Sequence, residues 1–125
     1  MPKLESKIQQ EIVIWYTNNY CLKHHEPREI IFSVPNENQQ RLISSGVLPG
    51  VSDLIFSHRG ELIFCEVKRP GQKQRPKQVE FQERIEALGF KYFLVYNLEQ
   101  FKKIILHLSN TKQRNEPKNS KGRLF

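Results

Sequence analysis

The amino-acid sequence predicts an α/β fold in which helices flank a mixed β-sheet, with the element order α-β-β-β-α-β-α. The length of 125 residues and the mass of 14.9 kDa suit a single domain with a core of its own. A content of 38% hydrophobic and 26% charged residues is typical of a globular chain. Short β-branched runs alternate with segments of helical period, which predicts strands and helices packed in layers.

The first part of the chain contains a predicted helix, a strand and a further short helix. Residues 3–20 have apolar side chains at helical spacing, and the pattern breaks around Pro27. Residues 30–34 form a short β-branched run that Pro35 stops, which predicts a strand. Residues 37–45 are expected to add a short helix. The apolar stripe of the first helix consists of Leu4, Ile8, Ile12 and Trp15.

Two strands are predicted near the middle of the chain. Residues 51–56 and 62–67 are separated by residues 57–61, whose Ser-His-Arg-Gly-Glu sequence is typical of a hairpin connection. The second strand opens with four consecutive apolar residues, which indicates that both of its faces are covered. It is therefore expected to be an interior strand of the sheet.

The last part of the chain adds a helix over residues 76–88, a strand over residues 90–96 and a final helix over residues 98–108. From Asn110 onward the composition is polar and basic and has no apolar period, so we expect a disordered tail. The predicted organisation is therefore a folded domain over residues 1–109 and a basic tail over residues 110–125.

The charge is strongly positive and uneven. Twenty Lys and Arg residues against thirteen Asp and Glu residues give a net charge of +7. Clustered positive charge favours a polyanionic partner, nucleic acid first and an anionic membrane surface second, although basic runs can also be solvated faces. One cluster consists of Lys68, Arg69, Lys73, Arg75 and Lys77, and the other consists of Lys112, Arg114, Lys118, Lys121 and Arg123.

Several classes of protein are excluded by absences from the sequence. No apolar run approaches the roughly 20 residues that a membrane span requires. Cys21 and Cys65 are far apart, so neither a disulfide framework nor a cysteine-based zinc site is expected. The first residues lack the apolar core of a signal peptide, which predicts a cytoplasmic protein, or one in the host cytoplasm if the source is viral.

The residues that carry chemistry lie on the two central strands. Glu66 and Lys68 are two apart, so they point to one face of their strand while Val67 points to the other. A carboxylate on a buried strand costs free energy unless it is compensated. If the hairpin loop has an even residue count, Asp53 lies opposite or diagonal to Glu66. Two such carboxylates repel each other, and Mg²⁺ is the hard cation that relieves this repulsion.

Two interpretations of these residues remain open at this point. Glu66 and Lys68 can also leave the strand end for solvent and pair with each other. Gln78 falls on the inward face of its helix, where it is either a hydrogen-bonding residue of a site or a plain helix cap. The other residues of that face are Phe81, Ile85 and Leu88.

A family resemblance adds to this pattern. Gly50-Val51-Ser52-Asp53-Leu54, followed by Glu66-Val67-Lys68, Gly71 and Gln78, resembles the PD-(D/E)XK nuclease superfamily. Within that superfamily the chain is similar to the VRR-NUC (virus-type replication–repair nuclease) domains over about residues 3–108. The family usually has proline where this chain has Ser52, and often a small residue where it has Glu37. The similarity extends to Glu5 with Ile8-Gln9, to Val34-Pro35-Asn36 and to Gly89.

The resemblance implies a restriction-endonuclease-like fold and a metal site. Asp53 and Glu66 would hold Mg²⁺ or Mn²⁺, with the Val67 carbonyl as a third ligand. Lys68 would position the attacking water or offset charge on the scissile phosphate, and Gln78 would steady that lysine or the substrate.

A glutamate of the first helix would complete the outer metal shell through water. Glu5 and Glu11 compete for this role. At about 100° per residue, Glu5 falls within the apolar stripe of the helix and Glu11 lies at its edge, so Glu5 is favoured.

The implied function is a metal-dependent, structure-selective DNA endonuclease that acts on branched DNA such as four-way (Holliday) junctions in replication or repair. The alternatives are a non-catalytic nucleic-acid-binding module on the same fold and a flap- or nick-directed nuclease that acts as a monomer. The expected DNA-binding residues are Arg69, Lys73, Arg75, Lys77, Lys112 and Arg114.

The resemblance to junction resolvases also predicts a homodimer, because symmetric cuts need two sites. Two apolar helix edges are the candidate interfaces. The alternative is that both edges pack within one chain. The edges consist of Val13, Tyr16 and Tyr20 in the first helix and Ile104, Ile105 and Leu108 in the last.

Overall fold

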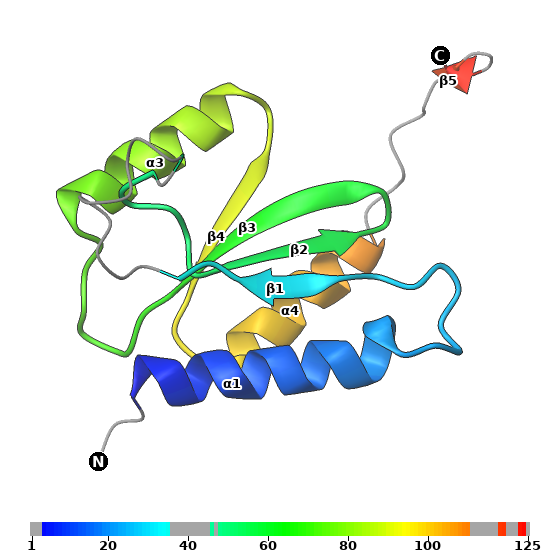
Figure 1. The fold of residues 1–125 in the computed structure, drawn as a ribbon, viewed down its shortest axis with the longest axis horizontal. Coiled ribbons are helices and arrows are strands. Elements are labelled where there is room, and N and C mark those ends of the chain that lie inside the picture. Colours follow the sequence, from blue (N-terminus) through cyan, green and yellow to red (C-terminus); the bar gives the residue numbers. More distant parts are fainter. Residues whose placement is uncertain (1–3, 36–45, 47, 111–117, 120–122, 125) are drawn as a thin grey trace.

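The computed structural model describes residues 4–35, 46, 48–110, 118–119 and 123–124 of the chain (Figure 1). Its centre is a four-stranded sheet with the strand order β1-β2-β3-β4. The observed order of helices and strands confirms the predicted α-β-β-β-α-β-α fold. The elements are α1 (Glu5–Tyr16), a π-helical turn (Thr17–Cys21), β1 (Ile31–Ser33), β2 (Leu54–His58), β3 (Glu61–Val67), α3 (Pro76–Ala87), β4 (Lys91–Val95) and α4 (Leu98–Asn110).

The sheet is mixed, and a tight hairpin sets its register. β2 pairs antiparallel with both β1 and β3, whereas β4 pairs parallel with β3. The turn between β2 and β3 contains two residues, Arg59 (φ 52°) and Gly60 (φ 86°), and positive φ at both is the geometry that suits a two-residue hairpin. The loop is therefore shorter than the predicted 57–61. Its residue count is even, as the pairing of Asp53 with Glu66 requires, because His58 pairs with Glu61.

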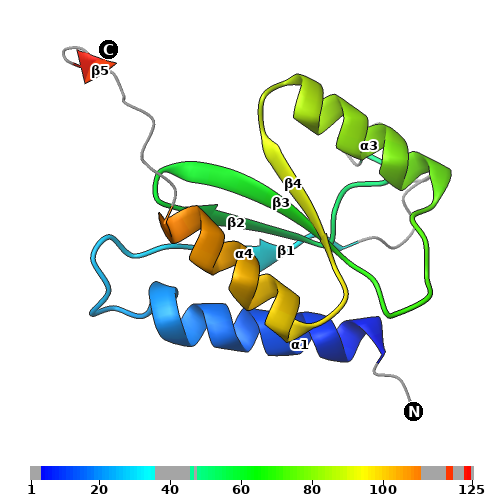
Figure 2. The ribbon, with the colours of Figure 1, turned by 180° about the vertical axis from the view of Figure 1, so that it is seen from behind.

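Helices cover both faces of the sheet (Figures 1 and 2). α1 and α4 pack on one face, where Ile8, Tyr16 and Phe101 share the main core with inward residues of β2 and β3. α3 covers the other face, where Phe81 and Tyr92 belong to a second, smaller core. β3 lies between β2 and β4, which confirms the predicted interior strand.

The predicted boundaries need correction at two places. The first helix is regular only to Tyr16 and then widens into the π-helical turn. The strand predicted over residues 51–56 starts its pairing with β3 at Leu54, so Asp53 lies just before the ladder. The helix predicted over residues 37–45 lies outside the described residues.

The two helix edges expected to form a dimer interface lie inside the chain. Tyr16 is fully buried and Ile105 is 2% exposed. The remaining residues of both edges, Val13, Tyr20, Ile104 and Leu108, pack against the main core. The structure therefore favours the alternative that both edges pack within one chain. An apolar helix edge has the same sequence pattern whether a neighbouring helix or a second chain covers it.

The tail is described only in part. α4 ends at Asn110, one residue beyond the predicted domain boundary. Further along, β5 (Lys118–Asn119) and β6 (Arg123–Leu124) pair antiparallel with each other. Lys112 and Arg114 lie outside the described residues. In the part of the chain that the structure describes, no helix is long and apolar enough to span a membrane.

Candidate active site

The candidate site lies at the end of the sheet where β2 begins and β3 ends. Leu54 pairs with Cys65, so continuing the antiparallel register brings Asp53 opposite Glu66. Asp53 Oδ2 accepts a hydrogen bond of 2.8 Å from the Val67 backbone N–H. The carboxyl group of Asp53 is thereby fastened across the strand end.

Close packing holds the segment before Asp53 in place. Gly50 has a positive φ of 85°, and a Cβ at this position would lie 2.1 Å from the carbonyl oxygen of Lys77. Only glycine allows this approach, so the loop that leads to Asp53 lies directly against the first turn of α3. Ser52, where the family usually has proline, is fully buried and donates a hydrogen bond to the Leu54 carbonyl.

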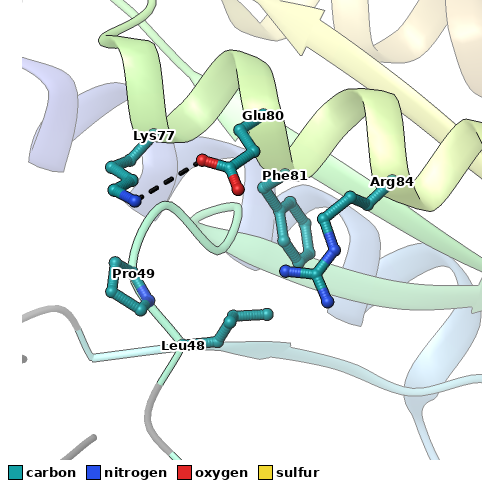
Figure 3. A pocket seen from close by; sticks show the side chains of 6 residues that line it. All are labelled: Leu48, Pro49, Lys77, Glu80, Phe81 and Arg84. Carbon is teal, nitrogen blue, oxygen red and sulfur yellow. Dashed lines mark hydrogen bonds and ion pairs between the residues drawn. The ribbon is translucent and has the colours of Figure 1, made fainter.

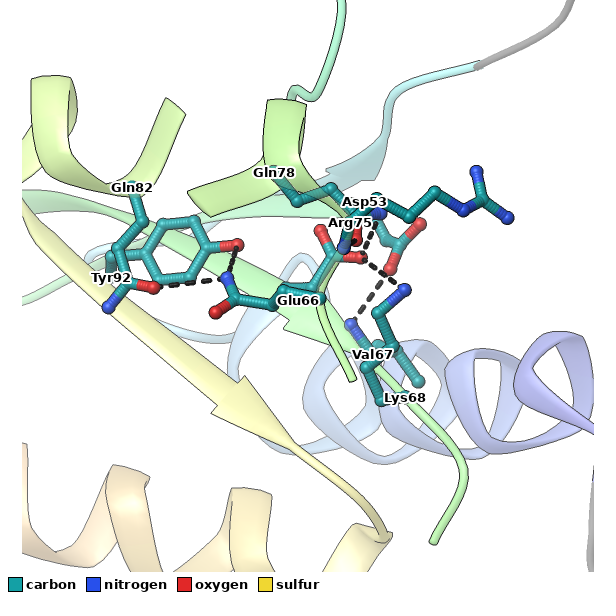
Figure 4. A network of polar contacts seen from close by, with 9 residues as sticks. Asp53, Glu66, Val67, Lys68, Arg75, Gln78, Gln82 and Tyr92 are labelled. Carbon is teal, nitrogen blue, oxygen red and sulfur yellow. Dashed lines mark hydrogen bonds and ion pairs between the residues drawn. The ribbon is translucent and has the colours of Figure 1, made fainter. Parts of the chain in front are cut away.

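Glu66 and Lys68 are both buried at this strand end (Figure 4). Glu66 is 1% exposed and Lys68 is 3% exposed, which excludes the interpretation that both side chains leave for solvent. The Lys68 ammonium lies 3.7 Å from Glu66 Oε2. Glu66 Oε1 is buried and has no hydrogen-bond partner among the described residues. Such an atom in a native structure indicates a missing ligand or a functional role.

Gln78 serves as both a helix cap and a partner of the site. Its Oε1 accepts a hydrogen bond of 2.7 Å from the Arg75 backbone N–H at the start of α3. Its Nε2 donates a hydrogen bond of 2.9 Å to Glu66 Oε2. The two interpretations of Gln78 from the sequence are compatible, because an amide has a separate donor and acceptor.

The electrostatic balance of the site is unfavourable in the absence of a cation. Burial raises the pKa of Glu66 to about 8, and the Asp53 charge adds to this while Lys68 opposes it. Burial also raises the pKa of Asp53, and the hydrogen bond from Val67 partly offsets that shift. The two carboxyl groups affect each other unequally, because the Asp53 charge raises the pKa of Glu66, whereas a hydrogen bond between the two groups lowers the pKa of Asp53.

The residues at this strand end fit a hard divalent cation. Mg²⁺ binds proteins through one or two carboxylates and completes its shell with water and substrate phosphate. Asp53 and Glu66 supply two carboxylates, and Glu66 Oε1 is free of any described partner. In a strand, the N–H and C=O of one residue point to the same side, so the Val67 carbonyl faces the Asp53 side too. Among the described residues, no group of three or more His, Cys, Asp or Glu side chains is placed to hold a metal ion.

Glu5 lies at the start of α1 and its charge reaches the carboxyl pair. It raises the pKa of Asp53 and of Glu66. With the Gln72 amide turned so that both of its ends are satisfied, Gln72 donates to Glu5 Oε2. The charge of Glu5 therefore acts on both carboxyl groups of the site.

Four of the six expected DNA-binding residues follow this strand end along the chain. Arg69, Lys73 and Arg75 lie in the loop between β3 and α3, and Lys77 lies in the first turn of α3. Lys73, Arg75 and Lys77 are exposed. The positive charge of the loop is therefore open to a polyanion at the edge of the site.

A small hollow lies beside the first turns of α3 (Figure 3). Its volume is about 80 Å³, and it is lined by Leu48, Pro49, Lys77, Glu80, Phe81 and Arg84. Lys77 forms an ion pair of 3.5 Å with Glu80, which lowers the net charge of this surface. Arg84, which the sequence pattern did not single out, adds a cation there.

Sequence reasoning also missed a polar contact network beside Glu66. The hydroxyl of Tyr92, which lies in the predicted strand over residues 90–96, accepts a hydrogen bond of 3.1 Å from Gln74 Nε2. Gln74 Nε2 also donates to Gln82 Oε1 at 3.0 Å. The alternation of glutamine and basic residues from 72 to 75 was the available signal.

The fold agrees with the one that the resemblance implied. No protein-family model matches the chain, and no curated protein matches it. A solved structure of a VRR_NUC domain protein is similar, with a TM-score of 0.69 and 20% sequence identity. The similarity covers 85% of this chain and 88% of that one. The structural comparison confirms the resemblance at the level of the fold.

Proposed function

We propose that this chain is a metal-dependent nuclease that hydrolyses phosphodiester bonds in DNA. One observation carries the proposal: Glu66 Oε1 is buried without a described partner, in a carboxyl group that already faces Asp53. A buried, unpaired carboxylate oxygen is destabilising unless a ligand satisfies it. A divalent cation does so, and the VRR_NUC-like fold supports a nuclease over other metal proteins.

The residues around the carboxyl pair have complementary chemical roles. Asp53, Glu66 and the Val67 carbonyl would hold Mg²⁺ or Mn²⁺, which supplies Lewis acidity and lowers the pKa of water when bound. Lys68 presents an ammonium group beside Glu66, where it can stabilise charge that develops on the phosphate or orient the attacking water. Gln78 keeps the Glu66 carboxylate in position through its hydrogen bond.

The outer residues bind rather than react. Glu5 would contact the metal through water at the start of α1. The cations of the loop between β3 and α3 would contact phosphates, which positions the substrate without reading its sequence. Lys77 and the tail cations Lys112 and Arg114 are proposed to extend this phosphate contact.

A cleavage assay with defined DNA structures tests the proposal. We expect Mg²⁺ or Mn²⁺ to support cleavage of at least one of a four-way junction, a flap, a nicked duplex and a linear duplex. Ca²⁺ should bind but support little cleavage, because its looser coordination positions water poorly. Asp53→Asn is the matched control against a contaminating nuclease. Cleavage that persists in excess EDTA, or that is equal in the Asp53→Asn variant, would contradict the proposal.

We further propose that the preferred substrate is branched DNA and that the active form is a homodimer. Each chain has one carboxyl pair, and symmetric cuts at a four-way junction need two. A second copy would bind at the groove between α1 and β1, where Leu4, Ile14 and Phe32 are exposed. Among the described strands, β1 pairs only with β2, so its other edge is available to the same strand of a partner.

Light scattering and junction mapping separate this from the monomeric alternative. A dimer should have twice the mass of 14.9 kDa and nick a junction at two symmetry-related positions. Phe32→Glu should convert it to a monomer and uncouple the two nicks. The burial of both helix edges within one chain favours the second candidate, a monomeric flap- or nick-directed nuclease. A strictly monomeric wild type that nicks junctions once would support that candidate.

A further inference from the structure

The loop between β3 and α3 alternates two kinds of residue. Gln72 and Gln74 are half-buried, whereas Lys73 and Arg75 are exposed. The glutamines thus face the protein and the basic side chains face solvent. A flexible basic loop does not require buried glutamines, because flexible basic side chains can bind phosphates without being held against the protein. The pattern indicates a loop whose conformation is held.

Gln74 connects the loop to two different elements. Its Nε2 donates to Gln82 Oε1 on α3 at 3.0 Å and to the Tyr92 hydroxyl on β4 at 3.1 Å. Tyr92 is only 6% exposed, and its ring belongs to the core beneath α3. The position of the hydroxyl is therefore fixed, because the Tyr92 ring is packed between α3 and the sheet.

Two further contacts hold the same loop. Arg75 donates its backbone N–H to Gln78 Oε1 at 2.7 Å. In the satisfied orientation of its amide, Gln72 accepts a hydrogen bond of 3.1 Å from Arg69 and donates to Glu5. The loop is thus tied to α1, α3 and β4 together. Ordering a loop before a ligand arrives removes part of the entropy cost of binding.

We propose that Gln74 and Tyr92 are positioning residues, which hold this loop in the conformation that presents Lys73 and Arg75 to the phosphates of bound DNA. This inference rests on the proposed function only in naming DNA as the ligand. Neither Gln74 nor Tyr92 reaches the reacting atoms. They act through the two cations, so their loss changes DNA binding and leaves the bond-breaking step intact.

Removal of the Tyr92 hydroxyl is the most specific test of this proposal. Tyr92→Phe keeps the packed ring and removes only the acceptor of the Gln74 bond. Tyr20→Phe is the matched control, because the Tyr20 hydroxyl has no hydrogen bond to any described residue and lies on the opposite face of the sheet. Binding is measured by fluorescence anisotropy with a labelled four-way junction and a labelled duplex, in Ca²⁺ buffer at several salt concentrations.

We expect Tyr92→Phe to weaken DNA binding several-fold and to make log K less steep in log salt by about 0.9 for each phosphate that the protein no longer neutralises. KM should rise while the cleavage rate at saturating DNA stays at the wild-type value. Tyr20→Phe should change none of these quantities. A purely structural role would lower the melting temperature without changing the salt slope. Gln74→Leu provides a second variant in the loop itself if Tyr92→Phe folds poorly.

A double-mutant cycle decides whether the effect passes through the cations. In a background that carries Lys73→Gln and Arg75→Gln, Tyr92→Phe should have no further effect on DNA binding. An equal loss in both backgrounds, or an unchanged salt slope in Tyr92→Phe, would overturn the inference. A wild type that binds DNA but does not cut it would contradict the proposed function alone. A wild type that binds no DNA would overturn both.

Discussion

Two buried polar clusters lie at opposite ends of the β2–β3 hairpin, and they are built differently. At the turn end, His58 is 3% exposed and its ring nitrogens contact the Tyr16 hydroxyl at 2.8 Å and Ser109 Oγ at 2.9 Å. At the open end, Glu66 is 1% exposed and one of its carboxylate oxygens has no partner among the described residues. His58 and Glu66 are thus about equally buried. The ring nitrogens of His58 both have hydrogen-bond partners, whereas one oxygen of Glu66 has none among the described residues.

The hydrogen bonds of the turn end account for every donor and acceptor of its ring. Tyr16 donates its hydroxyl proton to the Ser57 carbonyl, so His58 Nδ1–H donates to the Tyr16 oxygen. His58 Nε2 then accepts from Ser109 at the end of α4. Glu29 completes the cluster by accepting from Ser57 Oγ at 2.7 Å and from the Arg59 N–H at 3.0 Å.

This difference in hydrogen bonding distinguishes a structural cluster from a candidate functional site. A buried polar group whose partners are all present ties elements together, and the turn end joins α1, α4 and the hairpin. A buried carboxyl group with an unused oxygen and a repelling neighbour departs from that rule. Such departures are expected at functional sites. Variants at the two ends should therefore separate stability from activity.

The largest effect is expected from the carboxyl pair. Asp53→Asn and Glu66→Gln should each reduce cleavage by at least about a hundredfold, because removal of one charged group from a preorganised site has effects of that size. The free energy of unfolding of the metal-free protein should stay level or rise, since either change relieves charge repulsion. Cleavage assays and urea unfolding measure the two effects. A destabilised variant with full activity would reverse the assignment of the two ends.

Lys68 should separate metal binding from cleavage. Lys68→Ala should reduce cleavage by about 10²–10³-fold, because the ammonium would no longer stabilise developing charge. Binding of Mn²⁺ should remain, because lysine is not a ligand in the proposed site. Calorimetry with Mn²⁺ and cleavage at saturating metal give the two readouts. If the variant cuts DNA at the wild-type rate, the proposed role of Lys68 is wrong.

At the turn end, Tyr16→Phe should destabilise the protein and spare its chemistry. The change leaves buried His58 Nδ1 and the Ser57 carbonyl without their shared partner, at a cost of about 1–3 kcal/mol in the free energy of unfolding. The cleavage rate and the affinity for Mn²⁺ should match those of the wild type at a temperature where both are folded. Loss of metal affinity in this variant would show that the two ends are coupled.

The strand pattern was informative about the open end because its geometry is local. Alternation along β3 and a short even turn bring Asp53, Glu66 and Lys68 to one end of the sheet, and both features can be predicted from adjacent residues. The turn end was not predicted, because Tyr16 and Ser109 are 42 and 51 residues away from His58 along the chain. Contacts of that kind depend on how α1 and α4 cross the sheet.

The two ends should also respond to pH with opposite sign in the metal-free protein. Burial raises the pKa of Glu66 from 4.5 to about 8, so its contribution to stability is present below 4.5 and is lost as pH rises through 8. Burial lowers the pKa of His58 from 6.5, so its contribution is present above 6.5 and is lost as pH falls through the folded value.

Urea unfolding from about pH 5 to about pH 9 measures both slopes. Glu66→Gln should remove the loss of stability on the alkaline side alone, and His58→Gln should remove the loss on the acidic side alone. Saturating Mg²⁺ should also restore the alkaline stability of the wild type, since in the proposed site it would bind the ionised carboxyl pair. An alkaline slope that survives in Glu66→Gln would assign it to another group.

The smallest effect is expected where the turn end meets the tail. Ser109 contacts His58 and Asn110 ends α4, so a deletion of residues 111–125 leaves both buried clusters intact. It removes five cations, Lys112, Arg114, Lys118, Lys121 and Arg123. DNA binding should weaken a few-fold, and the salt slope should fall by about 0.9 for each phosphate that these cations neutralise in the wild type. The cleavage rate at saturating DNA and the melting temperature should not change.

A shorter chain that ends at residue 108 should instead lose stability, because His58 Nε2 would lose its partner. If both truncated chains unfold at the wild-type temperature, the hydrogen bond between Ser109 and His58 does not stabilise the protein. The structural role assigned to the turn end would then be wrong.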